Sequence, residues 1–415
     1  MELLYKILSL NVGNSSTLGG LLTILKMENP HIVMLQEVTL SSEQLNLIVA
    51  KLGYKAETNI DISNPTALGT GFVWKSNLPV SEVYNVVECR TQILKLGIYN
   101  FANIYAPSGS QNRQSRRNFF GQDIFRLVRG LDKSPPILGG DFNCILNSKD
   151  TESNFNDKKC PALKDLVDNF NYSDAYRCLH PSGRDFTFCR PKCAASRLDR
   201  FYIPQNLLEN IISVNHHASL SDHRYVIMII SLPDSAKLPD PVVSSSPYWK
   251  LNTSILKDED FLENFSNMYQ KLKERIPEYT DIADWWDLCA KPSFKKYCMG
   301  VSTMLANVRK DTKKFLFSLL NIALKERDWK EVARIRQEIK EILQYEAMGF
   351  VVRSRFKENS ESEVASLFHV NRENKNASKN NLTSLKIGNN VTSKKEEVEE
   401  NALKYFGAPF NGSPW

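Results

Sequence analysis

The run Gly139-Gly140-Asp141-Phe142-Asn143 ends an apolar stretch that begins at Pro135, and it places a carboxylate close to an amide. Asp141 and Asn143 are two positions apart, so on an extended backbone their side chains share one face. The paired glycines would let this backbone approach a ligand closely. A strand that ends on such chemistry indicates the wall of a polar cleft.

Other apolar stretches of the first 233 residues also end on polar side chains. Hydrolysis of a phosphodiester needs a metal ion, a group that orients water, a donor to the developing charge and help for the leaving oxygen. Glu37 suits Mg²⁺, which takes few protein ligands and retains waters, and His223 beside an acid can handle protons. The full set is Asn11, Glu37, Tyr105, Asp141, Asn143, Asp199, Asp222 and His223.

Many short strands with few helices between them must position these residues. This pattern favours an α/β fold in which two mixed sheets pack face to face with helices outside, and functional residues gather at one edge. The predicted strands are Tyr5–Val12, His31–Gln36, Gly69–Lys75, Gln92–Ile98, Phe101–Ile104, Pro135–Gly140, Phe186–Cys189, Leu198–Ile203 and Tyr225–Leu232, and the predicted helices are Leu18–Met27 and Arg113–Leu131.

The remainder of the chain has a different character, being mostly helical and charged. Residues 234–247 are rich in Pro and Ser and predict an extended linker. Helical patterns from Asp258 to Arg275 and from Phe315 to Tyr345 predict a helical connector over residues 248–370. Residues 371–415 are predicted to form a flexible tail, because Asn, Lys and Ser dominate its first part.

Composition sets broader limits. The net charge of +6 and the pI near 8.7 permit a polyanionic partner without requiring one. The 8 cysteines contain no CxxC pair, so we expect reduced thiols in an intracellular protein. No apolar run reaches membrane-spanning length, and we expect no membrane association.

Six motifs occur in order along the first 233 residues, namely Leu10-Asn11, Gln36-Glu37, Asn103-Ile104-Tyr105-Ala106-Pro107 (the tyrosine block), Gly140-Asp141-Phe142-Asn143, Ser196-Arg197-Leu198-Asp199-Arg200 (the serine block) and Ser221-Asp222-His223. In this order they resemble the motifs of the endonuclease/exonuclease/phosphatase superfamily, which has the deoxyribonuclease-I-like fold, a four-layer sandwich. Within this superfamily, three segments are most similar to the apurinic-type endonucleases of LINE-type, non-LTR retrotransposons. They are the tyrosine block (residues 103–107), the serine block (residues 196–200) and Ser173-Asp174-Ala175-Tyr176-Arg177. Sphingomyelinases and inositol phosphatases fit less well.

The resemblance implies a role for each matching residue. Glu37 would bind Mg²⁺, with Mn²⁺ as a substitute, and Asn11 and Asp222 would support this or a second metal position. Asp141 and Asn143 would position the attacking water, with Asp141 as the base. Asp199 would orient His223, Tyr105 and Asn11 would contact the scissile phosphate, and Thr187 matches a further active-site block.

Positive residues close to the motifs could contact DNA. Arg113, Arg116 and Arg117 follow the tyrosine block, and Arg197 lies in the serine block. Such contacts give salt-dependent affinity that is largely independent of sequence, although a solvated helix face is an equally simple explanation for the cluster. His180, His216 and His217 are expected to be packing or surface residues, and Gly13 to Gly20 lacks the lysine of a phosphate-binding loop.

The predicted function is that of an Mg²⁺-dependent DNA endonuclease from a non-LTR retrotransposon, nicking target DNA to leave a 3′ hydroxyl that primes reverse transcription. Its site of action would be the nucleus. Segments near Gly349–Phe356 and Ile387–Asn389 resemble the stretch that precedes the reverse transcriptase in such polyproteins, which suggests element RNA as a further partner. The chain contains no Asp-Asp pair, so we expect the polymerase domain to be absent.

Three alternatives remain at this point. An abasic-site or repair nuclease is less favoured, because such enzymes usually have an aspartate two residues after the asparagine, where this chain has Gly13. An inactive remnant would bind nucleic acid without cutting it, yet every expected chemical position holds a competent residue. A phospholipid or inositol phosphate hydrolase would need a lipid-facing apolar loop, which the sequence lacks.

Overall fold

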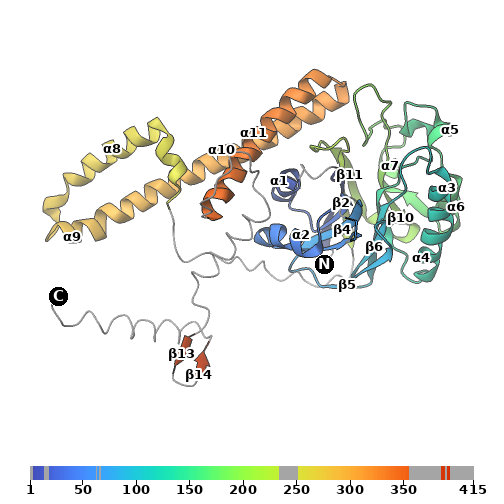
Figure 1. Ribbon diagram of the computed structural model, residues 1–415, viewed down its shortest axis with the longest axis horizontal. Helices are drawn as coiled ribbons and strands as arrows, with labels where there is room; N and C mark the ends of the chain where they lie inside the picture. Colours follow the sequence, from blue (N-terminus) through green and yellow to red (C-terminus); the bar gives the residue numbers. More distant parts are fainter. Residues whose placement is uncertain are drawn as a thin grey trace. The chain divides into compact units, whose positions relative to one another are not determined.

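The computed structural model describes residues 3–13, 18–61, 63–64, 67–232, 251–354, 385–387 and 390–392 (Figure 1). The chain divides into two compact units, residues 1–342 and 343–415. The predicted linker, residues 234–247, lies outside the described residues, as does most of the predicted tail. Among the described helices, none is both long enough and apolar enough to cross a bilayer.

Two six-stranded mixed sheets form the β-sandwich of the first unit. The first sheet has the order β11-β12-β1-β2-β4-β3, and its strands are β1 (Leu3–Asn11), β2 (Ile32–Val38), β3 (Tyr54–Asn59), β4 (Gly69–Lys75), β11 (Ile211–His217) and β12 (Tyr225–Leu232). The second sheet has the order β5-β6-β7-β8-β10-β9, and its strands are β5 (Val80–Val87), β6 (Thr91–Leu96), β7 (Tyr99–Tyr105), β8 (Ile137–Asp141), β9 (Tyr172–Asp174) and β10 (Asp199–Pro204).

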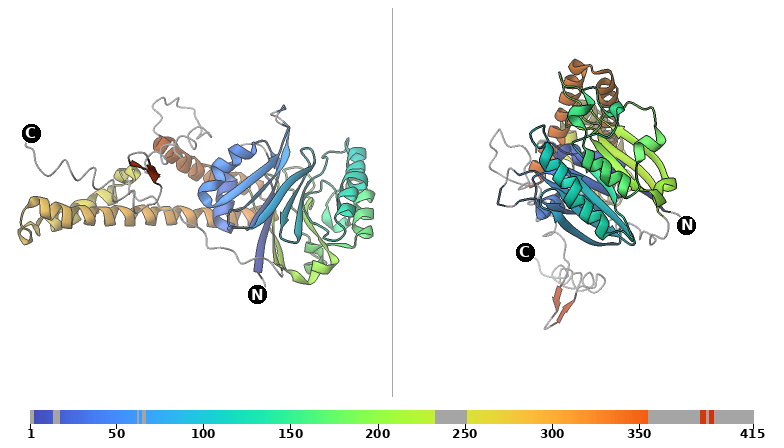
Figure 2. Two further views of the ribbon diagram at one scale, coloured as in Figure 1. Left: turned by 90° about the horizontal axis from the view of Figure 1, so that it is seen from below. Right: turned by 90° about the vertical axis from the view of Figure 1, so that its right-hand side faces the viewer.

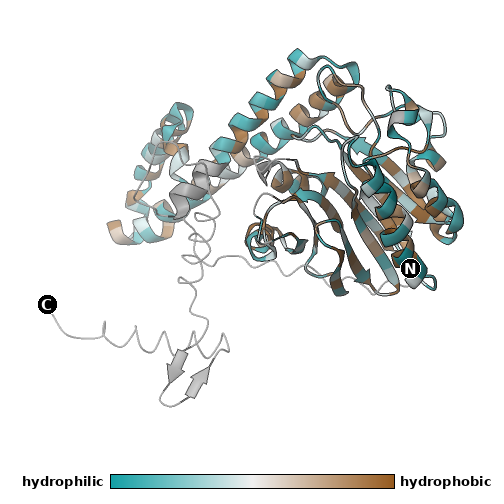
Figure 3. Cartoon of the chain, turned by 45° about the vertical axis from the view of Figure 1, so that its right-hand side comes forward, coloured by the Kyte–Doolittle hydropathy of each residue, from teal (hydrophilic) through white to brown (hydrophobic). Residues whose placement is uncertain are grey.

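The two sheets pack face to face through one apolar layer (Figure 2). Met34 and Phe72 from the first sheet share this layer with Phe101, Ile137 and Phe201 from the second, and all five are at most 1% exposed. Figure 3 shows the strands as predominantly hydrophobic and the helices as hydrophobic on one side. Burial of this layer removes apolar surface from water and is the main stabilising contribution to the sandwich.

Helices cover both outer faces and complete the four layers (Figure 1). On the second sheet, helix residues such as Phe120 and Leu163 pack against Ile104 and Leu138. The predicted α/β sandwich with helices outside is therefore confirmed. The helices are α1 (Leu18–Glu28), α2 (Ser42–Val49), α3 (Arg113–Asn118), α4 (Phe125–Gly130), α5 (Phe155–Lys158), α6 (Pro161–Asn169) and α7 (Ala175–Leu179), with a π-helical segment (Phe119–Ile124) joining α3 to α4.

The adjacent glycines Gly139 and Gly140 allow close packing of the strands and sheets around them. A Cβ atom on Gly139 would lie 2.5 Å from both Met34 Sδ and Phe201 Cε1, between the two sheets. A Cβ atom on Gly140 would lie 2.0 Å from the carbonyl oxygen of Ile104 on the neighbouring strand. Protein atoms therefore fill the space that the absent side chains of both glycines leave.

One predicted strand is also wrong. Phe186–Cys189 is no strand, since Phe188 makes only isolated bridges, to Ser196 and to His223. These bridges nevertheless bring the segment to the edge of the sandwich, where Thr187 contacts the start of β10.

In the described part of the chain after residue 250, the α-helices are α8 (Glu259–Lys273), α9 (Ile282–Trp285), α10 (Lys291–Glu326) and α11 (Trp329–Ser354). The predicted helical stretch from Phe315 to Tyr345 is interrupted, because Arg327 adopts a left-handed backbone with φ of 60°. Asp328 then caps α11 by accepting a hydrogen bond from the Glu331 amide at 3.0 Å. The result is a helical hairpin in place of one helix.

The second unit contains the end of α11 and a short hairpin. β13 (Leu385–Ile387) pairs antiparallel with β14 (Asn390–Thr392). This hairpin lies within the segment that was predicted to be a flexible tail.

Candidate active site

Two pairs of parallel strands bring the polar strand ends to one edge of the sandwich. β1 and β2 run parallel in the first sheet, with Asn11 opposite Gln36. β7 and β8 run parallel in the second sheet, with Tyr105 opposite Asp141. β10 then places Asp199 opposite Asp141. The carboxyl ends of parallel strands share an edge, so strand pairing itself assembles the predicted site.

Glu37 enters this edge from an irregular backbone. The pairing of β2 with β4 shifts between Gln36 and Val38, and Glu37 between them has φ of 61°. A residue other than glycine pays a conformational cost in this left-handed region. A bulge of this kind re-aims a side chain, and here it directs the Glu37 carboxylate toward Asn11 and Tyr105.

Asn11 connects the two sheets at the site. Its Nδ2 donates to Glu37 Oε1 and to Asp141 Oδ2, at 3.1 Å each. Its Oδ1 accepts from the Gly13 amide at 3.0 Å, which fixes the orientation of the side-chain amide. The predicted role of Asn11 as a metal ligand does not match this orientation, because its donor nitrogen faces the carboxylates and its oxygen is engaged elsewhere.

Asp141 and Asn143 meet, although not as neighbours on one extended strand. β8 ends at Asp141, and Asn143 has φ of 49°, so the chain turns between them. The Asn143 amide nitrogen donates to Asp141 Oδ1 at 2.9 Å, and its Nδ2 donates to Asp141 Oδ2 at 3.1 Å. The carboxylate is therefore held by a short turn that presents both oxygens in a defined geometry.

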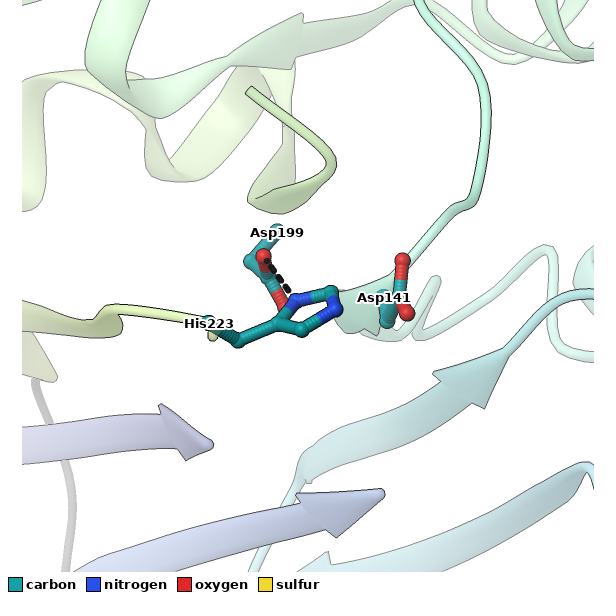
Figure 4. A group of neighbouring side chains, drawn as sticks. All are labelled: Asp141, Asp199 and His223. Atoms are coloured by element: carbon teal, nitrogen blue, oxygen red, sulfur yellow. Dashed lines mark hydrogen bonds and ion pairs between the residues drawn. The ribbon is translucent and has the colours of Figure 1, made fainter. Parts of the chain in front are cut away.

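His223 lies between two buried aspartates (Figure 4). Its Nδ1 lies 2.9 Å from Asp199 Oδ2, and its second ring nitrogen is on the side of Asp141. Thr187 Oγ1 accepts from the backbone amides of Leu198 at 2.9 Å and Asp199 at 3.0 Å. Thr187 thus fixes the start of β10 and with it the position of Asp199.

Burial and charge perturb the pKa values of this group. Burial of His223 opposes its charged form, but the carboxylate of Asp199, followed by those of Asp141 and Asp222, raises its pKa to about 10. Burial, followed by the negative charge of Asp199, raises the pKa of Asp141 to about 6. A charged imidazole beside a carboxylate that ionises near neutral pH is a typical acid–base arrangement.

Tyr105 lies next to Glu37 in the site. Its hydroxyl lies 3.4 Å from Glu37 Oε1, and the guanidinium carbon of Arg90 lies 4.6 Å from the centre of its ring. Burial, followed by the charge of Glu37, raises the pKa of Tyr105. The hydroxyl therefore stays protonated and can donate a hydrogen bond to a phosphate oxygen.

Asp222 occupies a different position from the other acids. Its carboxylate forms an ion pair with Arg190 on a neighbouring loop, and its backbone carbonyl accepts from the Cys189 amide at 3.0 Å. Asp222 is next to His223, and its negative charge helps to raise the pKa of His223. Its own carboxylate is paired with Arg190.

The four predicted DNA-binding arginines fall into two classes. Arg113 and Arg117 are exposed on α3. Arg116 is 5% exposed and donates to the carbonyls of Pro107 and Gly109, so it fixes the loop after β7. Arg197 is fully buried, which contradicts its predicted contact with DNA.

A buried ionic network explains Arg197. Its guanidinium makes two hydrogen bonds to Asp150 at 2.9 Å each, and it also contacts both carboxylate oxygens of Asp174. These acids raise the pKa of Arg197 against the effect of burial. A buried guanidinium requires such bidentate partners, so Arg197 anchors the segment that leads into Asp199.

Sequence reasoning gave no role to a second buried polar pair. Gln36 Nε2 donates to Asn103 Oδ1 at 2.7 Å across the two sheets. Asn103 Nδ2 donates to the carbonyls of Leu35 and Gly71, at 2.9 Å each. Gln36 and Asn103 both belong to the six sequence motifs, and this membership could have identified them as residues close to the site. Gln36 lies one residue before Glu37 and Asn103 lies two residues before Tyr105, so this pair joins the two sheets next to the site.

Side chains that could hold a metal ion gather here. Ligand atoms of Asp141, Asp199 and His223 lie within 4.8 Å of one another. Glu37 and Asp141 offer a second carboxylate pair, since both accept from the same Asn11 nitrogen. Mg²⁺ prefers oxygen ligands, and a metal ligand must be deprotonated. The raised pKa of His223 therefore favours the carboxylates of Glu37 and Asp141 as ligands.

The fold and this constellation define a phosphoester hydrolase class. Residues 8–223 match the Endonuclease/Exonuclease/phosphatase family, and the chain belongs to that family. This confirms the family predicted from the six ordered motifs.

One curated relative is a transposon protein. Over 217 residues the chain is 27% identical to the "Transposon TX1 uncharacterized 149 kDa protein" of Xenopus laevis. The matched stretch is 51% of this chain but 16% of the relative. The chain therefore spans only a small part of that protein.

Solved structures with a similar fold include two AP endonucleases and a 3′ phosphatase. The AP endonuclease LMAP from Leishmania major is 17% identical, with a TM-score of 0.49 over 55% of this chain and 88% of that one. The AP endonuclease from Archaeoglobus fulgidus is 18% identical, with a TM-score of 0.49 over 55% of this chain and 99% of that one. The 3′ phosphatase NExo from Neisseria, bound to product DNA hairpin, is 18% identical, with a TM-score of 0.47 over the same shares.

Proposed function

We propose that this protein is an Mg²⁺-dependent DNA endonuclease of a non-LTR retrotransposon, which nicks target DNA and leaves a 3′ hydroxyl. The observation that carries the proposal is the convergence of Asp141, Asn143 and the His223–Asp199 pair with Glu37 at one edge of the sandwich. The similarity to a transposon protein supports the retroelement context.

The residues divide the chemical work. Asp141, held by Asn143, accepts a proton from the attacking water, and its raised pKa suits a base near neutral pH. His223, kept charged by Asp199, stabilises the negative charge that develops on the phosphate. The Tyr105 hydroxyl and the Asn11 amide supply further donors.

The metal position would be held by Glu37 and Asp141, with Mn²⁺ able to replace Mg²⁺. The ion supplies charge neutralisation and Lewis acidity for the phosphate. Asn11 acts by holding the two carboxylates in place.

The partner beyond target DNA would be element RNA, bound through the connector. Helix α10 contains eight Lys and Arg residues and two acidic residues, and Lys295, Lys296, Lys310 and Lys314 are exposed. A surface of this charge attracts polyanions through counterion release. Action on chromosomal DNA would require the protein in the nucleus, which fractionation of expressing cells would test.

Plasmid nicking in Mg²⁺ tests the enzymatic proposal. Supercoiled DNA should become open circular, EDTA should stop the reaction, and a DNA polymerase should extend the nick without prior phosphatase treatment. Full activity of Asp141→Asn or His223→Ala would refute the assigned roles. Binding without cleavage would favour the inactive remnant.

Abasic and intact duplexes separate the repair alternative. A preference for abasic sites would favour repair, and equal cutting of both substrates supports the retroelement function. Gly13 argues against the repair alternative, because repair-type enzymes usually have an aspartate at this position. Here the backbone φ of 60° suits glycine, and a Cβ atom would lie 3.3 Å from Ser221 Cβ.

A further inference from the structure

The α10–α11 hairpin contacts the loop that carries His223. On α11, Arg336 Nη2 donates to the carbonyl oxygen of Ser221 at 2.7 Å. On α10, Asn321 Oδ1 accepts from Arg224 Nη2 at 2.9 Å. The two contacts lie on either side of His223 in the sequence, two residues before it and one after it.

Ser221 joins this contact to both halves of the active site. Its hydroxyl donates to the Asn11 carbonyl at 3.0 Å and accepts from the His223 amide at 2.9 Å. A shift of the Ser221 backbone would therefore move the residue that holds Glu37 and Asp141 as well as the catalytic histidine.

Arg224 has a comparable position on the other side. It is 3% exposed, and it donates to the carbonyls of Phe186 at 3.0 Å and His216 at 2.7 Å. Its backbone amide donates to the Thr187 carbonyl at 2.7 Å. Asn321 thus accepts from an arginine that ties together the segments around His223 and Thr187.

The hairpin is suited to hold this loop. Leu320, Leu324, Ile335 and Ile339 are buried on α10 and α11, at most 5% exposed. Arg336 is partly buried, and burial lowers its pKa, with Asp222 acting in the opposite direction. A desolvated arginine at a backbone carbonyl gives a directional contact that a mobile surface side chain cannot give.

We propose that the α10–α11 hairpin is a positioning element of the active site, in which Arg336 and Asn321 hold Ser221 and Arg224 and so fix His223 against Asp199. The nuclease centre would then extend beyond the sandwich into the helical region. This inference rests on the nuclease function proposed above. Arg336 and Asn321 act through other residues and touch no reacting atom.

Variants of the full chain test this inference by steady-state nicking. Arg336→Gln should lower kcat by about tenfold and leave KM for DNA within about twofold, because misplacement of a catalytic group costs rate. Asn321→Leu should behave in the same way, whereas Asn321→Asp keeps an acceptor for Arg224 and should retain activity. Arg334→Gln is the matched control on α11, since Arg334 forms exposed pairs with Glu331 and Glu338 and such pairs contribute little.

A double-mutant cycle distinguishes positioning from loss of stability. If Arg336 acts through His223, Arg336→Gln should slow a His223→Ala enzyme by less than about twofold, because coupled residues are not additive. An undiminished loss in that background, or a wild-type kcat for Arg336→Gln, would overturn the inference. Melting temperatures of all variants would verify folding at the assay temperature.

Hydrogen exchange gives a readout that is independent of activity. Backbone amides of residues 219–224 should exchange faster in Arg336→Gln than in wild type or Arg334→Gln, by about tenfold. Unchanged exchange would contradict the inference even if the protein cut no DNA. An inactive wild type with this change in exchange would refute the nuclease proposal alone.

Discussion

The side-chain amide of Asn11 donates to Asp141 Oδ2 at 3.1 Å, although 130 positions separate the two residues in the chain. The same nitrogen donates to Glu37 Oε1. One neutral side chain therefore holds carboxylates from both sheets close together, which would otherwise repel each other.

Replacing Asn11 should impair catalysis more than stability. Asn11→Ala is expected to lower kcat by about 10- to 100-fold, as for other groups that orient metal ligands, and to raise the Mg²⁺ concentration required for half-maximal rate. Nicking rates titrated with Mg²⁺ measure both effects. Asn100→Ala is the control, since Asn100 bonds to the Ser134 carbonyl near the opposite end of β7, and it should leave kcat unchanged.

Ionisation of Asp141 should control the acidic limb of the pH–rate profile. As a base it must be deprotonated, so without a shift from the metal the rate should rise as the pH increases through about 6. A bound cation favours the carboxylate and would move this limb to lower pH. Profiles recorded at two Mg²⁺ concentrations should differ in that direction, and a limb that is absent above pH 5 at both would argue for another base.

The His223–Asp199 pair should stabilise the fold in a pH-dependent way. The folded pKa of His223 is raised to about 10 above an unfolded value near 6.5. Its contribution is therefore fully present below about pH 6.5 and is lost as the pH rises through about 10.

Urea unfolding of wild type and His223→Gln at pH 6, 8 and 10 measures this contribution. The difference in unfolding free energy should be about 3 kcal/mol at pH 6, as for a disrupted buried pair, and should shrink toward pH 10. A difference that stays constant over this range would show that packing of the ring, and not its charge, stabilises the fold.

Gly139→Ala should test whether the glycine pair serves packing. The new methyl group would meet Met34 and Phe201 between the sheets, so we expect a loss of about 1–3 kcal/mol in unfolding free energy. A combined Phe201→Leu substitution should recover part of that loss. Gly130→Ala is the control, because no atom beyond its chain neighbours and its own helix backbone lies within 4 Å of its Cβ position, and it should be neutral or stabilising.

The sequence allowed prediction of the interior of the fold but not of its borders. All eight interior strands were predicted, whereas β3, β5, β9 and β11, the four edge strands, were not. Interior strands are covered on both faces and form continuous apolar runs. The edge strand β5 contains partly exposed and exposed residues but no buried one, so it resembles a loop in composition.

The site was predictable as a set of residues but not as a geometry. Strand ends and motif order identified Glu37, Asp141 and His223. The bulge at Glu37 and the turn at Asn143 depend on left-handed backbones, which no local pattern revealed. The burial of Arg197 depends on Asp150, 47 positions away, and a contact at that distance requires the folded chain.

Arg197 and Arg117 should therefore respond in opposite ways to substitution. Arg197→Met removes the buried guanidinium that pairs with Asp150 and Asp174 and leaves Asp150 with Arg177 as its cation, and should cost about 3–5 kcal/mol in unfolding free energy. Arg117→Ala removes an exposed charge on α3, and should leave stability within about 0.5 kcal/mol. If Arg117 contacts phosphate, it should also reduce the magnitude of the slope of log affinity against log salt by about 1. Thermal unfolding and DNA binding at several salt concentrations measure these effects. A wild-type melting temperature for Arg197→Met, together with a smaller slope of log DNA affinity against log salt, would instead identify Arg197 as a DNA contact. A guanidinium that pairs only with acids of the protein would not change how DNA affinity depends on salt.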